Sequence, residues 1–146
     1  MPLPDDLFPA TTDHADATIA LGRRLAAHLG PGDVVALDGD LGAGKTHLVK
    51  GIVDGLGGDP DDVTSPTFTL VHTYSTPRGP VHHVDAYRIE RAVDFAEIGG
   101  EELLDDETAV VVVEWPERIA PALPRGVLRL RLEHTGGDTR RLVRVG

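Results

Sequence analysis

The chain has 146 residues, with 24 acidic side chains against 14 basic ones and a formal net charge of −10. This length predicts one domain over residues 1–146, of which about residues 1–11 form a flexible N-terminal segment. An acidic surface repels phosphate backbones, so direct nucleic-acid binding is not expected, and the lack of cysteine excludes disulfides and thiolate metal sites.

The apolar runs and the N-terminal sequence bear on the cellular location. No apolar run approaches the roughly 20 residues that span a bilayer. The first ten residues are acidic and proline-rich, not basic and then apolar. We therefore expect neither a signal peptide nor a membrane anchor. A cytoplasmic location agrees with this pattern and with the absence of cysteine.

The first third of the chain predicts a helix, a strand and a second helix. Apolar residues recur four apart over 16–29, which predicts a helix with Thr12, Asp13 or Asp16 as its N-cap. The apolar residues within 33–38 predict a strand buried on both faces of a parallel sheet. Residues 45–56 predict the helix that follows, because their apolar positions share one side.

Between that strand and that helix, residues 39–46 read GDLGAGKT and match the phosphate-loop pattern G-x-x-x-x-G-K-[ST]. Its glycines permit a tight turn in which successive backbone N–H groups converge on a phosphate at the start of a helix. Lys45 would bridge the β- and γ-phosphates, and the Thr46 hydroxyl would ligate Mg²⁺. The residues assigned to the nucleotide phosphates are Leu41, Gly42, Ala43, Gly44, Lys45 and Thr46.

The rest of the chain predicts mostly strands. Short helices are expected over 90–104, interrupted at Gly99 and Gly100. The expected strands are 67–74 and 81–87, joined by a proline- and glycine-containing turn, 109–114, buried on both faces, and 127–132 and 142–145, each with one wet face. The fold class is therefore α/β: a single P-loop NTPase-type domain with a central mixed sheet, parallel at its core with antiparallel hairpins, flanked by helices.

A phosphate loop needs a partner acid, which normally ends a neighbouring strand and faces the same edge of the sheet as the loop. Glu114 ends a strongly apolar strand, and we assign it to magnesium together with Thr46. Asp85 is assigned to orienting the attacking water or completing the outer shell of the metal. The residues themselves allow these two roles to be reversed. The adjacent His82 and His83 point to opposite faces of a strand, so they do not chelate one ion together.

The loop over 64–68 lies where nucleotide-sensing segments often occur, and its hydroxyl groups could reach a γ-phosphate or Mg²⁺. We assign Thr67 to catalysis together with Asp85 and Lys45; a Ser-Pro turn that starts a strand is the alternative. The chain has no asparagine for an Asn-Lys-x-Asp guanine motif and no glutamine to position water, so ATP is favoured. Trp115 is expected to be a packing residue with a polar handle.

Four segments, GDLGAGKT, SPTFTLVHTY, HVDAYR and VVVVEWPE, occur in an order that resembles the bacterial TsaE family, the ATPase component of tRNA threonylcarbamoyladenosine synthesis. The resemblance implies assembly with TsaD- and TsaB-type proteins, ATP hydrolysis that supports repeated turnover and depends on those partners, and tRNA chemistry that belongs to the partner. It also matches Thr46 and Glu114 to magnesium positions, Asp85 to the family's acid and residues 65–68 to a switch-like loop. It brings Thr18 near the nucleotide.

Two other functions fit a phosphate loop. A small-molecule kinase shares the loop and Mg²⁺, but this chain leaves little room for an arginine-bearing lid. A binding module in which ATP only orders residues 59–67 is not separable by sequence from a working ATPase. Arginines gather between residues 118 and 144, either as a docking face or as the solvated side of strands, and the motifs give no guidance there.

Overall fold

The computed structural model describes residues 2–40, 44–64 and 70–145, which form one mixed sheet with strand order β1-β7-β6-β2-β5-β4-β3. The four central strands β6, β2, β5 and β4 run parallel, and the outer strands pair antiparallel at both sides. The strands are β1 (Ala10–Thr12), β2 (Val34–Asp38), β3 (Val71–Tyr74), β4 (Val81–Asp85), β5 (Val110–Glu114), β6 (Leu128–Gly136) and β7 (Thr139–Val145). The predicted α/β class, with a parallel core and antiparallel hairpins, is confirmed.

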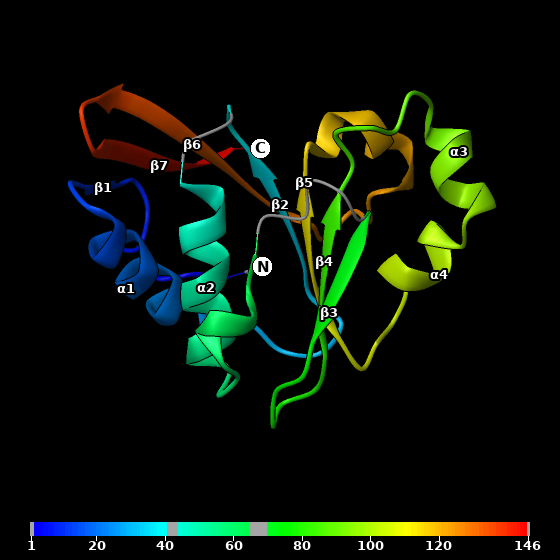
Figure 1. Cartoon of the computed structure of the whole chain (residues 1–146), viewed down its shortest axis with the longest axis horizontal. Coiled ribbons are helices and arrows are strands. Elements are labelled where there is room, and N and C mark those ends of the chain that lie inside the picture. Colours follow the sequence, from blue (N-terminus) through cyan, green and yellow to red (C-terminus); the bar gives the residue numbers. More distant parts are fainter. Residues whose placement is uncertain (1, 41–43, 65–69, 146) are drawn as a thin grey trace.

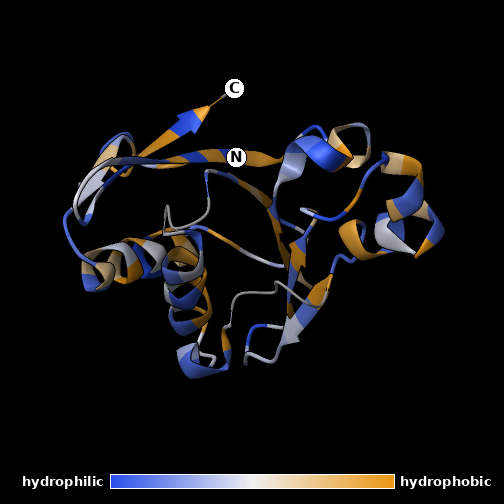
Figure 2. Cartoon of the chain, turned by 45° about the horizontal axis from the view of Figure 1, so that its top comes forward, coloured by the Kyte–Doolittle hydropathy of each residue, from blue (hydrophilic) through white to orange (hydrophobic). Residues whose placement is uncertain are grey.

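Helical segments cover both faces of the sheet (Figure 1). They are α1 (Ala15–Ala26), α2 (Lys45–Gly55), η1 (Pro60–Asp62), α3 (Ala92–Glu97), α4 (Gly100–Leu104) and η2 (Pro116–Ala122). α1 and α2 lie on one face, and α3, α4 and η2 on the other. Figure 2 shows hydrophobic residues concentrated on the strands and on the helix sides turned toward them. The sheet is thus an inner layer between two helical layers.

The central strands β2 and β5 are buried on both faces, as their unbroken apolar sequences predict. Alternate side chains of β5 enter different cores, with Val112 packed toward α1 and α2 and Val113 packed toward α3, α4 and η2. These two strands end at the same edge, where β2 leads into the phosphate loop.

Helices α1 and α2 approach each other closely where two glycines meet. A Cβ atom on Gly51 would overlap the carbonyl oxygen of Ile19, and one on Gly22 would overlap that of Leu48. An ion pair between Arg23 and Asp54 links the same helices near the surface. Gly22 interrupts the amphipathic pattern of α1 because the backbone of α2 occupies the space of its missing side chain.

The start of α1 differs from the expectation. α1 begins after His14, so Thr12, Asp13 and Asp16 are not its N-cap: Thr12 Oγ1 lies 2.7 Å from Thr18 Oγ1, and Asp13 hydrogen-bonds His14. Before this helix, Leu7 is 1% exposed and β1 pairs with β7.

Two strands end elsewhere than expected, and part of a third cannot be compared. β4 ends at Asp85, and β6 continues to Gly136 before the turn into β7. Of the strand expected over 67–74, β3 contains Val71–Tyr74, and residues 67–69 lie outside the described part of the chain.

Within residues 2–40, 44–64 and 70–145, no helix combines the length and apolar character needed to cross a membrane.

Candidate functional site

The candidate site lies at the carboxyl edge of the parallel strands. Strand register aligns Leu37 of β2 with Glu114 of β5, and Glu114 with Asp85 of β4. The phosphate loop follows β2 directly, so both predicted acids stand beside it. This edge is where open α/β sheets bind their ligands.

Lys45, the first residue of α2, is 5% exposed and points back toward the end of β2. Its ammonium donates a hydrogen bond to the carbonyl oxygen of Gly39 at 2.5 Å and lies 3.8 Å from Glu114 Oε1. Before it, Gly44 adopts φ 97°, a left-handed conformation that favours glycine. A buried lysine held between an acid and a carbonyl is poised to receive an anionic ligand.

Glu114 is 6% exposed, and its two oxygens have different neighbours. Oε2 lies 2.5 Å from Nε2 of His83, a side chain with no exposed surface, while Oε1 faces Lys45. From the sequence, His83 received no site role, although alternation along the strand puts it on the same face as Asp85.

Asp85 is half-buried next to Glu114, and its Oδ1 accepts a hydrogen bond from the Tyr87 N–H at 2.9 Å. Burial raises the pKa of Asp85 above the usual value, and the negative charge of Glu114 raises it further, whereas the Tyr87 N–H and Lys45 oppose the shift. Two carboxylates held side by side create an excess of negative charge that a cation would relieve.

Trp115 belongs to the site as well as to the packing. Its ring centroid lies 4.5 Å from the Lys45 ammonium and 4.9 Å from the ring of Tyr87. The sequence predicted a packing residue; the contact with Lys45 is a cation–π interaction that the sequence did not reveal.

The remaining predicted residues are placed less completely. Thr18 is 2% exposed, and its methyl group would lie 3.8 Å from a Cβ atom built on Gly44, so the two residues are neighbours. Thr46 is the second residue of α2 and half-buried. The predicted residues that lie outside the described part of the chain are Leu41, Gly42, Ala43 and Thr67.

Two hollows flank the loop. One, of about 80 Å³, is lined by His14, Ala15, Thr18, Gly44, His47, Asp138 and Arg140. The other, of about 360 Å³, is lined by Asp38, Gly39, Asp40, Arg131, Leu132, Glu133 and His134. The larger hollow carries three carboxylates and disfavours a phosphate, whereas the smaller one adjoins Gly44 and joins α1 to the turn between β6 and β7. No sequence motif covered that turn.

Glu114 and Asp85 alone do not form a complete site for a hard cation such as Mg²⁺. A bound ligand would have to supply further oxygen atoms. Among the described residues, no group of three or more histidine or acidic side chains is arranged to hold a metal ion. Glu114 and Asp85 supply oxygen atoms of the kind that Mg²⁺ prefers, and Mg²⁺ commonly takes one or two carboxylates together with phosphates and water.

Comparisons with known proteins agree with this architecture. The family described as threonylcarbamoyl adenosine biosynthesis protein TsaE matches residues 12–142. Among solved structures, YdiB from Bacillus subtilis superposes with a TM-score of 0.70 and 32% sequence identity, over 92% of this chain and 82% of that one.

Curated relatives carry the same family name. The tRNA threonylcarbamoyladenosine biosynthesis protein TsaE of Bacillus subtilis is 37% identical over 131 residues, covering 90% of this chain and 80% of that protein. Its namesake in Streptomyces coelicolor is 46% identical over 122 residues, covering 82% and 80% respectively. The chain therefore belongs to the TsaE family of threonylcarbamoyl adenosine biosynthesis proteins.

Proposed function

We propose that this protein is the Mg²⁺-dependent ATP-binding and ATP-hydrolysing subunit that supports tRNA threonylcarbamoyladenosine formation by a complex of TsaD- and TsaB-type proteins. The observation that carries the proposal is the position of Lys45. Lys45 is the lysine of the GDLGAGKT motif, and its buried ammonium lies at the start of α2, between the Gly39 carbonyl and Glu114. The family membership connects this site to tRNA modification.

The chain's own groups would bind the triphosphate as follows. The positive end of α2 and the backbone N–H groups of residues 41–46 would hold the β-phosphate. Lys45 would exchange its bond to the Gly39 carbonyl for the β- and γ-phosphate oxygens, a charge-assisted and therefore stronger interaction. The absence of asparagine and glutamine, which removes the usual guanine and GTPase elements, favours ATP.

Glu114 and Thr46 are the residues we assign to Mg²⁺, which when bound neutralises charge on the β- and γ-phosphates. Asp85 would orient the attacking water from the neighbouring strand. Its raised pKa increases its affinity for a proton from that water. Thr67 keeps its assignment to catalysis.

The smaller hollow extends the proposed site toward the nucleoside. It begins at Gly44 and is lined on one side by Thr18 and on the other by Arg140. Arg140 donates hydrogen bonds to the Gly137 and Thr139 carbonyls, and its side chain would lie 3.8 Å from a Cβ atom built on Gly44, just before α2. We assign the ribose or base to this position, because it continues directly from the loop.

Substituting Lys45 tests the proposal. Lys45→Ala should weaken ATP binding by about 10- to 100-fold, because a charge-assisted hydrogen bond contributes about 1.5–3 kcal/mol. A fluorescent ATP analogue titrated with and without Mg²⁺ measures this loss, and Lys50→Ala on the same helix is the matched control. Wild-type affinity in Lys45→Ala would contradict the nucleotide site.

Reconstituted tRNA modification tests the role in the pathway. With TsaD- and TsaB-type partners, wild-type protein should support repeated turnover and Lys45→Ala should not. Phosphate release that appears only in the assembled complex would support coupled hydrolysis. Full modification with Lys45→Ala would reject the proposed role, and ATP binding without phosphate release under any condition would favour a nucleotide-gated binding module.

A further inference from the structure

A buried hydrogen-bond chain connects Glu114 to strands β4 and β3. His83 Nε2 lies 2.5 Å from Glu114 Oε2, and His83 Nδ1 lies 3.0 Å from the hydroxyl oxygen of Tyr74. Tyr74, His83 and Glu114 are 5%, 0% and 6% exposed. The three residues come from neighbouring strands, which lie side by side in Figure 1.

The direction of the hydrogen bonds follows from the groups at the far end of the chain. Burial raises the pKa of Tyr74 above its usual value, and the backbone N–H of Thr64 opposes this only in part, so the hydroxyl stays protonated. The Tyr74 hydroxyl therefore has its own proton to donate, and Nδ1 of His83 is the acceptor within reach. The imidazole proton is then at Nε2, where it is donated to Glu114.

The two oxygens of Glu114 thus have different partners. Oε2 is committed to His83, so the carboxylate cannot rotate freely, and Oε1 stays toward Lys45 at the edge of the loop. A hydrogen-bonded outer partner fixes the orientation of a metal-binding carboxylate in many proteins.

We propose that Tyr74 and His83 are positioning residues that hold Glu114 with one oxygen available to the nucleotide-bound magnesium ion. This proposal rests on the function proposed above. It adds two residues that belong neither to the phosphate loop nor to the pair of acids assigned to magnesium and the attacking water. Their contribution acts through Glu114, because His83 is hydrogen-bonded to Glu114 directly and Tyr74 is linked to it through His83.

The opposite face of the same strands supplies a matched control. There, His82 Nδ1 lies 3.0 Å from Thr73 Oγ1, and His82 Nε2 lies 2.8 Å from Asp106 Oδ2. Thr73 and His82 belong to the same two strands, and Asp106 follows α4. This second hydroxyl–imidazole–carboxylate series therefore lies on the face away from Lys45. Substitutions in it perturb β3 and β4 similarly without touching Glu114.

The first measurement concerns the nucleotide-free protein. Nitrogen-15 NMR of the histidine rings should show the His83 proton on Nε2, and Tyr74→Phe should perturb that signal because Nδ1 loses its donor. A His83 proton on Nδ1 in the wild-type protein would overturn the proposal.

The second measurement is the magnesium requirement of nucleotide binding. It is the Mg²⁺ concentration at which half of the Mg²⁺-dependent increase in affinity for an ATP analogue is reached. His83→Leu should raise it by about 10- to 100-fold, the usual effect of losing an outer partner of a metal ligand. Tyr74→Phe should raise it less, and His83→Gln should restore part of the loss because its amide can donate to Glu114. Binding of the analogue in EDTA should stay unchanged in Tyr74→Phe.

The control variants Thr73→Val and His82→Leu should keep the wild-type magnesium requirement. If Tyr74→Phe and His83→Leu match these controls while the wild type binds Mg²⁺–nucleotide, the positioning role is wrong and the proposed function stands. If the wild type binds no Mg²⁺–nucleotide, the proposed function itself fails. Should His83→Leu not fold, Tyr74→Phe and the ring signal still decide the question.

Discussion

Trp115 shows how one residue serves both packing and chemistry. It follows Glu114 directly and is the only residue other than glycine with a positive φ among those described, at 56°. A bulky side chain rarely adopts this left-handed conformation, and residues that do so are concentrated at functional sites. Here it places the indole over the Lys45 ammonium and against Tyr87, and so closes one side of the site.

Asp85 allows a prediction that combines stability with activity. Its raised pKa means that folding favours the protonated carboxyl, so its stabilising contribution is full below the reference pKa of 3.8 and is lost as pH rises through the folded pKa. Asp85→Asn should therefore be more stable than wild type at pH 7. The gain should be a few degrees at most, because about 1 kcal/mol corresponds to roughly 4 °C in a domain of this size.

The gain in melting temperature should shrink toward pH 3, where the wild-type carboxyl is also neutral. In the assembled complex, hydrolysis by Asp85→Asn should fall by about 10²-fold or more, the usual contribution of a positioned base. Thermal melts across pH and phosphate-release assays measure the two effects. A variant less stable than wild type at pH 7 would show that burial and Glu114 do not destabilise the ionised carboxylate of Asp85.

At the scale of elements, the crossing of α1 and α2 fixes the position of α2, the helix that follows the phosphate loop. α2 starts at the loop and packs along α1, and their backbones come close at Gly22 and Gly51. Because the carbonyl groups of each helix occupy the space beside the other's glycine, these positions admit no side chain. Thr18 on α1 is held beside Gly44 by the same crossing.

Gly51→Ala should destabilise the protein by about 1–3 kcal/mol, since overpacking against backbone outweighs the gain of about 1 kcal/mol in helix propensity. Urea unfolding measures the change. Gly30→Ala is the control, because a Cβ atom there meets nothing within 4 Å. An alanine at position 51 that left stability unchanged would mean that the helices can separate without cost.

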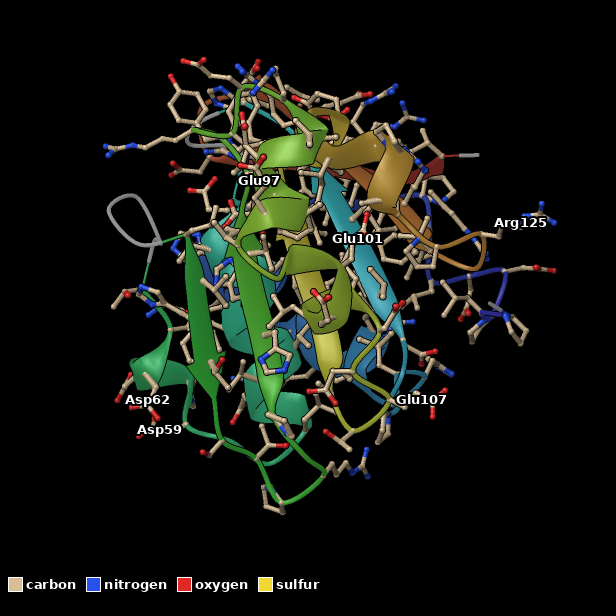
Figure 3. The ribbon with its side chains drawn as sticks, turned by 90° about the vertical axis from the view of Figure 1, so that its right-hand side faces the viewer. Asp59, Asp62, Glu97, Glu101, Glu107 and Arg125 are labelled. Atoms are coloured by element: carbon tan, nitrogen blue, oxygen red, sulfur yellow. The ribbon has the colours of Figure 1, made fainter. Side chains whose placement is uncertain are left out.

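At the scale of the whole molecule, the excess of acidic over basic residues places many carboxylates at the surface. Figure 3 labels exposed acids at η1 (Asp59 and Asp62), on α3 (Glu97), on α4 (Glu101) and in the loop before β5 (Glu107). On the β6–β7 hairpin, Leu128, Leu130 and Leu132 are buried while Arg131 between them is exposed, which confirms the predicted strands with one wet face.

The isolated protein should therefore not retain tRNA. We expect a dissociation constant weaker than about 10⁻⁴ M near 0.15 M salt, at or beyond the weak limit of non-specific binding. Electrophoretic mobility shift with unmodified tRNA measures this, and the complex with the TsaD- and TsaB-type partners is the positive control. Tight binding by the isolated chain that declines steeply with added salt would reveal a basic surface stronger than the charge pattern indicates.

The sequence by itself determined the fold class and the edge of the sheet at which the candidate site lies. Two strands without polar interruptions must be buried on both faces, and a glycine-rich loop directly behind one of them must open a helix. These are local properties of composition and spacing, so β2, α2 and β5 were found with nearly correct bounds. Glu114 and Asp85 were predicted to lie at one edge because parallel strands end at a common edge, and the strand register places them side by side.

Only the tertiary structure decided which side chains meet at that edge. The His83–Glu114 bond, the ring of Trp115 over Lys45 and the glycine crossing of α1 and α2 depend on strand register and helix packing. Tertiary contacts also explain two features near the N-terminus. Thr12 hydrogen-bonds Thr18 and does not cap α1, and β1 forms because it pairs with β7. Contacts between residues distant in the chain are fixed by packing the whole core, a constraint that no single segment of sequence contains.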